Sequence, residues 1–424
     1  MSQKQMKNSG IEWIGEIPND WNLIQNRWLF QEHSVKVGEN SSKYQLLSLT
    51  TGGVKEKDIN SSGGKVPESY DNYQTVEKGD MIFCLFDLDC SAVFSGLSEV
   101  NGMITSAYDV LKPNCNYLNE QFADFWFQYV FSNRYYKIYS KNIRYTVTSD
   151  TFKGILTPIP SLKQQKVIGC FLSEKSKQID ILIANQNAQI EKLKEYKHSI
   201  ITEAVTKGLD PTVPMKESGI EWIGSTPLHW IKISNKVLFK NVSIKNHGNA
   251  MVLSLYRDYG VIPKNSRDDN FNVTSLDTDS YKYVQPDDLV INKMKAWSGS
   301  LAISDYEGIV SPAYYTCKVN YKYVTKRFIH HYLRNRHLVA LYEMYSAGLR
   351  TGQWDLSIED FQKIEIVIPS TLEEQDAIAR AIDEKCTNID RLISIKQQKI
   401  EKLNEYKKSL IYEYVTGKKD VCSW

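Results

Sequence analysis

The feature that most constrains this 424-residue chain is an internal repeat. The stretch "MKNSGIEWIGEIPNDW" at residues 6–21 returns as "MKESGIEWIGSTPLHW" at residues 215–230, with 11 of 16 positions identical. Further matches follow in the same order: "YQTVEKGDMI" (73–82) aligns with "YKYVQPDDLV" (281–290), and "GMITSAY" (102–108) aligns with "GIVSPAY" (308–314). The chain must therefore fold into two related halves.

Each copy ends in a long helical pattern. Residues 179–206 and 389–416 align with an offset of 210, lack Pro and Gly, and place apolar residues three and four apart, interrupted at Lys197 and Lys407. Because an apolar stripe on so long a helix needs a partner, we expect the helices to pair with each other as an antiparallel coiled coil; the alternative is that each packs on its own domain. The predicted pairing residues are Ile179, Ile183, Ile190, Leu193, Ile200 and Ala204, with Ile389, Ile393, Ile400, Leu403, Leu410 and Tyr414.

Two diverged bodies lie between the repeated ends. The runs "DMIFCLF" (80–86) and "DLVIN" (288–292) are typical of strands, whereas residues 118–139 and 324–345 have the pattern of amphipathic helices. We expect a mixed α/β (α+β) fold in which two similar globular domains are separated by two long paired helices, related by a pseudo-twofold internal repeat.

Composition restricts the classes of partner and compartment. The 52 Lys and Arg nearly balance the 50 Asp and Glu, so any nucleic-acid contact must be local or shared with a more basic partner. Seven cysteines without CxxC spacing favour reduced thiols. The sequence shows no secretory leader and no membrane-length apolar run, so we expect a cytoplasmic protein without membrane contact.

The patterns expected of an enzyme are missing from the sequence. It contains no GxG cofactor loop, no GxxxxGK phosphate loop, and no Asn-Pro-Pro-aromatic run of an amino-methyltransferase. His330, His331 and His337 lack the spacing of metal ligands, and "PDDLVINK" (286–293) has Asn292 where a nuclease cluster needs its second acid. We therefore expect a non-catalytic binding protein that holds no metal and no cofactor of its own.

Several motifs occur in order in both copies. They are the "GIEWIG" starts with their following Pro and Trp, the helix starts "IPSLKQQ" (159–165) and "IPSTLEEQ" (368–375), and the helices with "IEKLKEYKHSI" and "IEKLNEYKKSL". The second body adds "INKMKAWSGSLA" (291–302), "GIVSPAYY" (308–315) and "GLRTGQW" (348–354). On these motifs the chain resembles the specificity (S) subunit of type I restriction-modification systems over nearly its whole length. The first body departs from that pattern at "FCLFDLDCSAVF" (83–94).

The resemblance implies two target-recognition domains that each read one half of a bipartite, asymmetric site in double-stranded DNA. It also implies that the subunit joins two adenine-N6 methyltransferase subunits and two ATP-driven restriction subunits. S-adenosylmethionine and ATP with Mg would then be bound by those partners. The expected domains are residues 1–160 and 209–370 for recognition, with spacer helices in residues 161–208 and 371–424.

Candidate DNA contacts lie where the two bodies differ. Lys293, Lys295 and Trp297 combine two cations with an aromatic ring, which suits phosphate contact and groove insertion, although a solvated loop explains them equally well. Arg and Gln suit bidentate contacts to guanine and adenine, whereas an Arg also serves as a phosphate clamp or in an ion pair. The further candidates are Arg350, Gln353, Arg144, Lys55, Lys57, Lys65, Tyr70 and Asn72.

Two rival functions come from other classes of protein. The first is a coiled-coil adaptor that organises partner proteins without reading DNA; the divergence of the two bodies argues against it, because a symmetric adaptor would keep them alike. The second is a self-contained methyltransferase-nuclease, which the missing motifs argue against.

Overall fold

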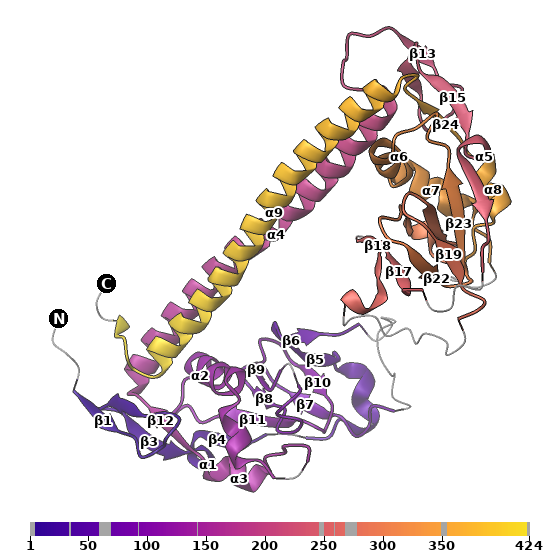
Figure 1. Ribbon diagram of the computed structural model, residues 1–424. Helices are drawn as coiled ribbons and strands as arrows, with labels where there is room; N and C mark the ends of the chain where they lie inside the picture. The colour runs from indigo at the N-terminus through magenta and orange to yellow at the C-terminus, as the bar shows by residue number, and fades with distance from the viewer. Residues whose placement is uncertain are drawn as a thin grey trace. The chain divides into compact units, whose positions relative to one another are not determined.

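The computed structural model describes residues 5–33, 35–58, 69–91, 93–141, 143–245, 250–257, 259–267, 278–348 and 354–421. Packing divides the chain into two units, Met1–Gln186 with Gln397–Trp424, and Asn187–Lys396. The two long helices, α4 (Leu162–Lys207) and α9 (Leu372–Val415), each contribute one part to both units (Figure 1). The packing thus groups the chain differently from the domain limits given above, which stay a prediction about the two sequence copies.

The first unit contains a four-stranded antiparallel sheet with the order β4-β11-β8-β9. Its strands are β1 (Met6–Asn8), β2 (Glu16–Pro18), β3 (Asn22–Gln25), β4 (Phe30–Glu32), β5 (Leu47–Thr50), β6 (Gly53–Glu56), β7 (Gln74–Val76), β8 (Met81–Phe83), β9 (Ser95–Leu97), β10 (Gly102–Ile104), β11 (Asp109–Pro113) and β12 (Leu156–Ile159). Its helices, besides the first part of α4 and the last part of α9, are α1 (Asn26–Leu29), α2 (Glu120–Ser132), α3 (Ser149–Gly154) and the 3-10 segments η1 (Gly38–Lys43) and η2 (Tyr135–Tyr139).

The second unit repeats this topology with a sheet of order β16-β23-β20-β21. Its strands are β13 (Met215–Glu217), β14 (Ser225–Pro227), β15 (Ile231–Ser234), β16 (Phe239–Val242), β17 (Leu253–Tyr256), β18 (Gly260–Pro263), β19 (Lys282–Val284), β20 (Leu289–Asn292), β21 (Leu301–Ile303), β22 (Gly308–Val310), β23 (Tyr314–Val319) and β24 (Glu365–Ile368). Its helices are α5 (Asn235–Leu238), α6 (Lys326–Leu333), α7 (Arg336–Tyr345), α8 (Ile358–Lys363), η3 (Lys264–Ser266) and η4 (Ala296–Ser298).

Each unit has its own apolar core between the sheet, the helix that follows it, and the long helices. In the first unit Phe83 of β8 packs on Phe127 of α2, with ring centroids 4.9 Å apart. In the second unit Phe328 of α6 and Leu289 of β20 belong to the equivalent cluster. The mixed α/β fold expected from the sequence, with two long helices, is therefore confirmed.

The two amphipathic helices expected in the bodies are shorter than predicted. In the first unit α2 ends at Ser132, because Arg134 adopts a left-handed backbone with φ 56° that an α-helix cannot contain. In the second unit the predicted helix 324–345 is broken into α6 and α7 at Asn335, whose side chain accepts hydrogen bonds from the backbone amides of His337 and Leu338. Predicting one continuous helix in each body was wrong for this reason.

The long helices run antiparallel within each unit. In the first unit the start of α4 packs on the end of α9, where the rings of Phe171 and Tyr414 lie 4.7 Å apart, and Lys407 Nζ lies 2.7 Å from Asp180 Oδ1. In the second unit Lys197 Nζ lies 2.7 Å from Asp390 Oδ2. These ion pairs are copies of each other, since Asp390 and Lys407 stand 210 residues after Asp180 and Lys197.

The helix faces that pair follow one pattern in both copies. Along α4 a row at spacings of three and four is buried or half-buried, and the residues 210 positions later form the same row along α9. The row on α4 is Gln165, Ile168, Leu172, Ser176, Ile179, Ile183, Gln186, Ile190, Leu193, Lys197, Ile200 and Ala204. All twelve predicted pairing residues lie in these two rows. The lysines that interrupt the apolar pattern reach the aspartates of the opposite helix.

A buried glutamine fixes each long helix to its body. Gln165 is fully buried and accepts a hydrogen bond from the backbone amide of Asn119, at the start of α2, over 2.8 Å. Gln375 accepts one from the backbone amide of Thr325, at the start of α6, over the same distance. The amide nitrogen of each glutamine donates to two backbone carbonyls. The last residue of "IPSLKQQ" and of "IPSTLEEQ" is thus a structural connector.

One further property concerns the helices as a set. In the part of the chain that the structure describes, none of them combines the length and the apolar composition required to cross a membrane.

Candidate nucleic-acid interface

The first candidate segment follows β20 in the second unit. The strand itself is buried, and the chain turns at Asn292, whose side chain accepts a hydrogen bond from the Met294 amide at 3.2 Å. Trp297 is held in place, since its indole nitrogen donates to the Met294 carbonyl at 3.0 Å and its ring lies 5.6 Å from that of Trp354. The partly exposed Trp297 ring is therefore presented from a fixed turn.

The two lysines of this segment differ in their surroundings. Lys293 Nζ lies 3.0 Å from Asp355 Oδ2, and this hydrogen bond raises the pKa of Lys293. The backbone of the segment also accepts a hydrogen bond from the Leu356 amide, which brings residues 354–356 beside it. Lys295 is exposed and pairs with no carboxylate among the residues described. Lys295 is thus the freer of the two cations for contact with an anion.

In each unit the segment after a central strand meets a later segment of the chain, and we call this contact the crossing. The crossing of the first unit carries its acid and its base in exchanged positions. The amide of Val147 donates to the carbonyl of Leu85, as Leu356 does to Lys293, and the amide of Asp87 donates to the carbonyl of Arg144. Arg144 Nε lies 3.9 Å from Asp87 Oδ1, and the Arg144 side chain is 81% exposed. In the first unit the acid, Asp87, is in the segment after β8, and the base, Arg144, is in the later loop. In the second unit the base, Lys293, comes after β20 and the acid, Asp355, comes later.

Of the remaining candidates, the structure describes Lys55, Lys57, Tyr70 and Asn72, which all belong to the first unit. Lys55 is exposed on β6, opposite Ser48, and Lys57 follows at the end of that strand. Tyr70 packs against Tyr73 with ring centroids 5.0 Å apart, and Asn72 is exposed in the adjoining turn. The structure does not bring these residues together with Arg144. Lys65, Arg350 and Gln353 lie outside the described residues.

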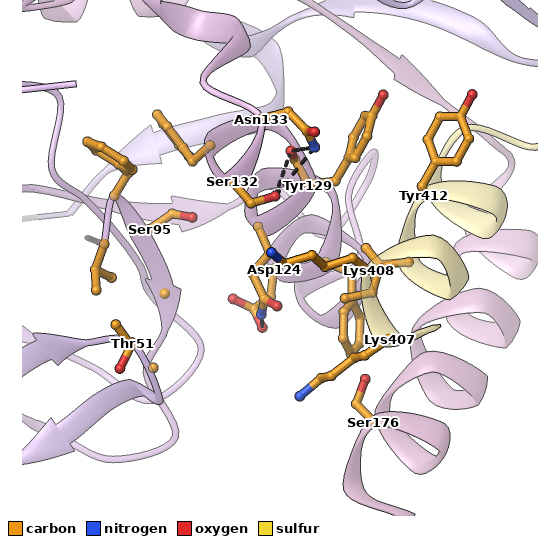
Figure 2. Close-up of a pocket in the computed structure, with 18 of the residues that line it drawn as sticks. Thr51, Ser95, Asp124, Tyr129, Ser132, Asn133, Ser176, Lys407, Lys408 and Tyr412 are labelled. Carbon is orange, nitrogen blue, oxygen red and sulfur yellow. Dashed lines mark hydrogen bonds between the residues drawn. The ribbon is translucent and has the colours of Figure 1, made fainter. Parts of the chain in front are cut away.

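A cleft of about 1180 Å³ opens in the first unit between α2, the β5–β6 turn, β9 and the long helices. Figure 2 shows Lys408 extending from α9 into this cleft toward α2, with Ser176 and Lys407 on the helical wall. Asp124 of α2 lies in it and accepts hydrogen bonds from the Leu97 amide at 3.2 Å and from Gln128 Nε2 at 2.7 Å. Burial raises the pKa of Asp124 to about 6 despite these bonds.

Asp124 was not among the residues predicted from the sequence. It stands on the predicted helix 118–139, where an acid on a helix face usually means a solvated surface. The signal that could have revealed it is the alignment with 324–345, in which His330 replaces Asp124 and Arg334 replaces Gln128. The two copies therefore differ in chemistry at this matched position.

The histidines and acids weighed as a metal or nuclease site have other partners. His331 Nε2 lies 2.7 Å from Asp383 Oδ1, and the ring of His337 stacks on Trp222 at 5.9 Å. Asp287 pairs with Lys326, and Asp288 pairs with Lys318. Within the described ranges no group of three or more His, Cys, Asp or Glu is arranged to hold a metal ion.

Comparison with known proteins shows what the chain is similar to. The family model described as "Type I restriction modification DNA specificity domain" matches residues 233–405, which lie in the second copy. A Methanocaldococcus jannaschii protein named as a type I restriction enzyme MjaX specificity subunit is 24% identical and aligns over 96% of this chain and 95% of its own length. The chain is thus similar to type I restriction-modification specificity subunits, and residues 233–405 match their DNA specificity domain.

Two further comparisons concern one more relative and the fold. The MjaVIII type I specificity subunit of the same organism is 26% identical over 64% of both chains. The fold is that of a solved chain reported under the words "Structural basis underlying complex assembly and conformational transition of the type I R-M system". That chain is 13% identical with a TM-score of 0.67, and the match covers 95% of this chain and 99% of the other.

Proposed function

We propose that this chain is the non-catalytic DNA-recognition subunit of a type I restriction-modification complex, and that its two bodies read the two halves of a bipartite, asymmetric site. The observation that carries the proposal is the contrast between scaffold and surface. Gln165 and Gln375 make the same hydrogen bonds, whereas the crossings at Asp87–Arg144 and Lys293–Asp355 carry exchanged charges. Two related bodies with different polar surfaces suit two different half-sites.

The duplicated surface of the long helices supports recruitment of two copies of one partner. Leu182 and Leu392, at equivalent places, are 45% and 47% exposed, and Tyr196 and Tyr406 are 59% and 56% exposed. Exposed apolar side chains that recur on matched faces are typical of docking surfaces. We propose that each face receives one adenine-N6 methyltransferase subunit and that two restriction subunits join this assembly. S-adenosylmethionine and ATP with Mg would be bound by those partners.

Co-expression with the methyltransferase subunit of the same system tests this function. We expect N6-methyladenine at one bipartite motif when both subunits and S-adenosylmethionine are present, and none with either subunit alone. Single-molecule sequencing of plasmid DNA provides the measurement. Methylation by this chain alone, or the same methylation pattern without it, would contradict the proposal. Assembly with the partner without any effect on DNA recognition would instead favour the coiled-coil adaptor.

A further inference from the structure

A short hairpin in the first unit presents an isoleucine to solvent. The backbone groups of Lys141 and Thr146 exchange two hydrogen bonds, at 2.9 and 3.1 Å, and thereby close the hairpin. Within it the side chain of Ile143 is 96% exposed and that of Arg144 is 81% exposed. Single exposed apolar residues are common on protein surfaces and need no function of their own. What distinguishes Ile143 is how the backbone around it is held.

Left-handed backbone is concentrated at this hairpin and at the segments that contact it. Among the described residues, four that are not glycine have a positive φ, and three of these are Asp87 (52°), Arg134 (56°) and Tyr145 (45°). Such a backbone costs free energy in a residue with a side chain, so it persists only where the surroundings impose it. Strain of this kind concentrates at functional sites, where it fixes a required geometry.

The segment after β8 holds the hairpin through its backbone. The amide of Asp87 donates to the carbonyl of Arg144 at 2.9 Å, and the amide of Leu88 donates to the carbonyl of Tyr145 at 3.4 Å. Both contacts are made to residues that directly follow Ile143. The two strained residues, Asp87 and Tyr145, therefore belong to one arrangement that fixes the direction of the tip.

Side chains from the end of α2 and from η2 complete this support. Arg134 donates from Nη1 to the carbonyl of Leu88 at 2.5 Å, so it fixes the segment that holds the hairpin. Lys137 Nζ lies 4.0 Å from the centre of the Tyr145 ring, which is a cation–π contact. Ile143 is thus an exposed side chain on a backbone that three other segments keep in place.

The surroundings of the hairpin are locally basic. Residues 125–149 contain no Asp or Glu, and their cations are Arg134, Lys137, Lys141 and Arg144. The facing segment 87–91 carries two acids, Asp87 and the exposed Asp89. Asp87 Oδ1 lies 3.9 Å from Arg144 Nε, which is longer than a hydrogen bond. The cations therefore outnumber the acids around an exposed apolar tip, in a chain that is nearly neutral as a whole.

We propose that this hairpin enters a groove of the DNA half-site that the first body reads, with Ile143 against the base pairs and with Lys141 and Arg144 on the flanking phosphates. A branched aliphatic side chain packs on thymine methyl groups or wedges between base steps. The first body has acids after β8 where the second has the segment with Trp297, so it needs another element to reach the bases. The inference deepens the proposed function and rests on it.

Binding of two related duplexes tests the contact at Ile143. The first probe is a fluorescent duplex that carries the motif found by methylation mapping. In the second probe the half read by the first body is scrambled; this is the half that survives exchange of residues 231–365. With the chain in complex with its methyltransferase subunit, we expect Ile143→Ala to bind the first duplex about tenfold more weakly and the second as the wild type does. Ile143→Val, which keeps a branched side chain, should retain most of the affinity.

Salt dependence separates the apolar tip from the cations beside it. An apolar contact releases no counterions, so Ile143→Ala should leave the slope of log K against log salt unchanged. Lys141→Ala should flatten this slope by about 0.9 and weaken binding to both duplexes equally. Leu228→Ala removes an exposed side chain of the same size from the second unit, and as the control it should change neither measurement.

The outcomes separate this inference from the function on which it rests. The inference is wrong if Ile143→Ala binds the first duplex as the wild type does, or if it weakens binding to both duplexes alike. It is also wrong if Ile143→Ala lowers assembly with the methyltransferase subunit and not DNA affinity, because the hairpin then docks a protein. In each of these cases the proposed function stands. If the wild-type complex does not distinguish the two duplexes, the proposed function fails, and the inference with it.

Discussion

The two units differ most where α2 and α6 face the long helices. In the first unit this face carries Asp124 and Gln128 and borders an open cleft. In the second unit the matched residues are His330 and Arg334, and the arginine reaches the neighbouring turn. The residues that anchor the same helices are unchanged in chemistry: Phe122 and Phe328 are both fully buried. After a duplication, therefore, the core restricted what could change, and the polar faces diverged.

The exposed faces of the long helices, by contrast, carry the same types of residue in both copies. Their lysine–aspartate pairs and their exposed leucines and tyrosines recur at matched places. Surface positions normally vary freely because they contribute little to stability. The helices keep matched surface residues, whereas the polar surfaces of the two bodies differ. This contrast supports the proposal that the helices hold identical partners while the bodies read different half-sites.

The largest effect expected from the comparison concerns pH, because Asp124 in the first unit and His330 in the second should make the stability of their units respond in opposite directions. The pKa of Asp124 is raised to about 6, so its folded form retains a proton that the unfolded chain releases near its ordinary pKa of about 3.8. The first unit thus loses stability as pH rises from about 4 to about 6. Burial and the charge of Arg334 lower the pKa of His330 to about 4. The second unit thus loses stability as pH falls from about 6.5 to about 4.

Asp124→Asn and His330→Gln separate these two dependences. Relative to the wild type, Asp124→Asn should be more stable at pH about 7 than at pH about 4.5, and His330→Gln should show the reverse. Since one pKa unit corresponds to about 1.4 kcal/mol, each difference should not exceed about 3 kcal/mol. Calorimetric unfolding at the two pH values provides the measurement. Shifts of the same sign in both variants would show that Asp124 and His330 do not act in opposite directions.

A smaller difference is expected at the tryptophans that end the repeated start motif. Trp230 donates from its indole nitrogen to Glu374 Oε1 at 2.9 Å. Trp21 occupies the equivalent place, but its indole nitrogen is buried with no hydrogen-bond partner in the described part of the chain. Here Gln164 stands at the position of Glu374 and binds Asp20 instead. Trp230→Phe should therefore destabilise its unit by about 1 kcal/mol more than Trp21→Phe, because only Trp230→Phe removes a hydrogen bond to a charged group. Equal losses in denaturant unfolding would show that the Glu374 bond adds nothing.

Much of the scaffold could be predicted from the sequence because its signals are local or repeated. Apolar spacing gave the pairing rows of α4 and α9, and the repeat indicated two equivalent units. The breaks at Arg134 and Asn335 were missed, although an Asn within "RNRH" is a common N-cap and was a usable signal. Lys197 and Lys407 were read as interruptions, because their aspartate partners come from the other helix and no local pattern reveals them.

The candidate interface was less predictable because it depends on contacts between distant segments. The segment containing Lys293 could be read from composition, but its ion pair with Asp355 joins residues that are far apart in the chain. The hydrogen bond from Arg334 to the backbone carbonyl of Arg257 likewise joins two segments that no local pattern connects.

The central claim is that each body reads its own half of one DNA site. The most direct test replaces residues 231–365 with the corresponding body of another specificity subunit, leaves α4 and α9 intact, and maps methylated adenines in cells that contain the methyltransferase partner. We expect a new motif in which one half has changed, while the other half and the spacing between them are retained. A motif changed in both halves, or in neither, would contradict it.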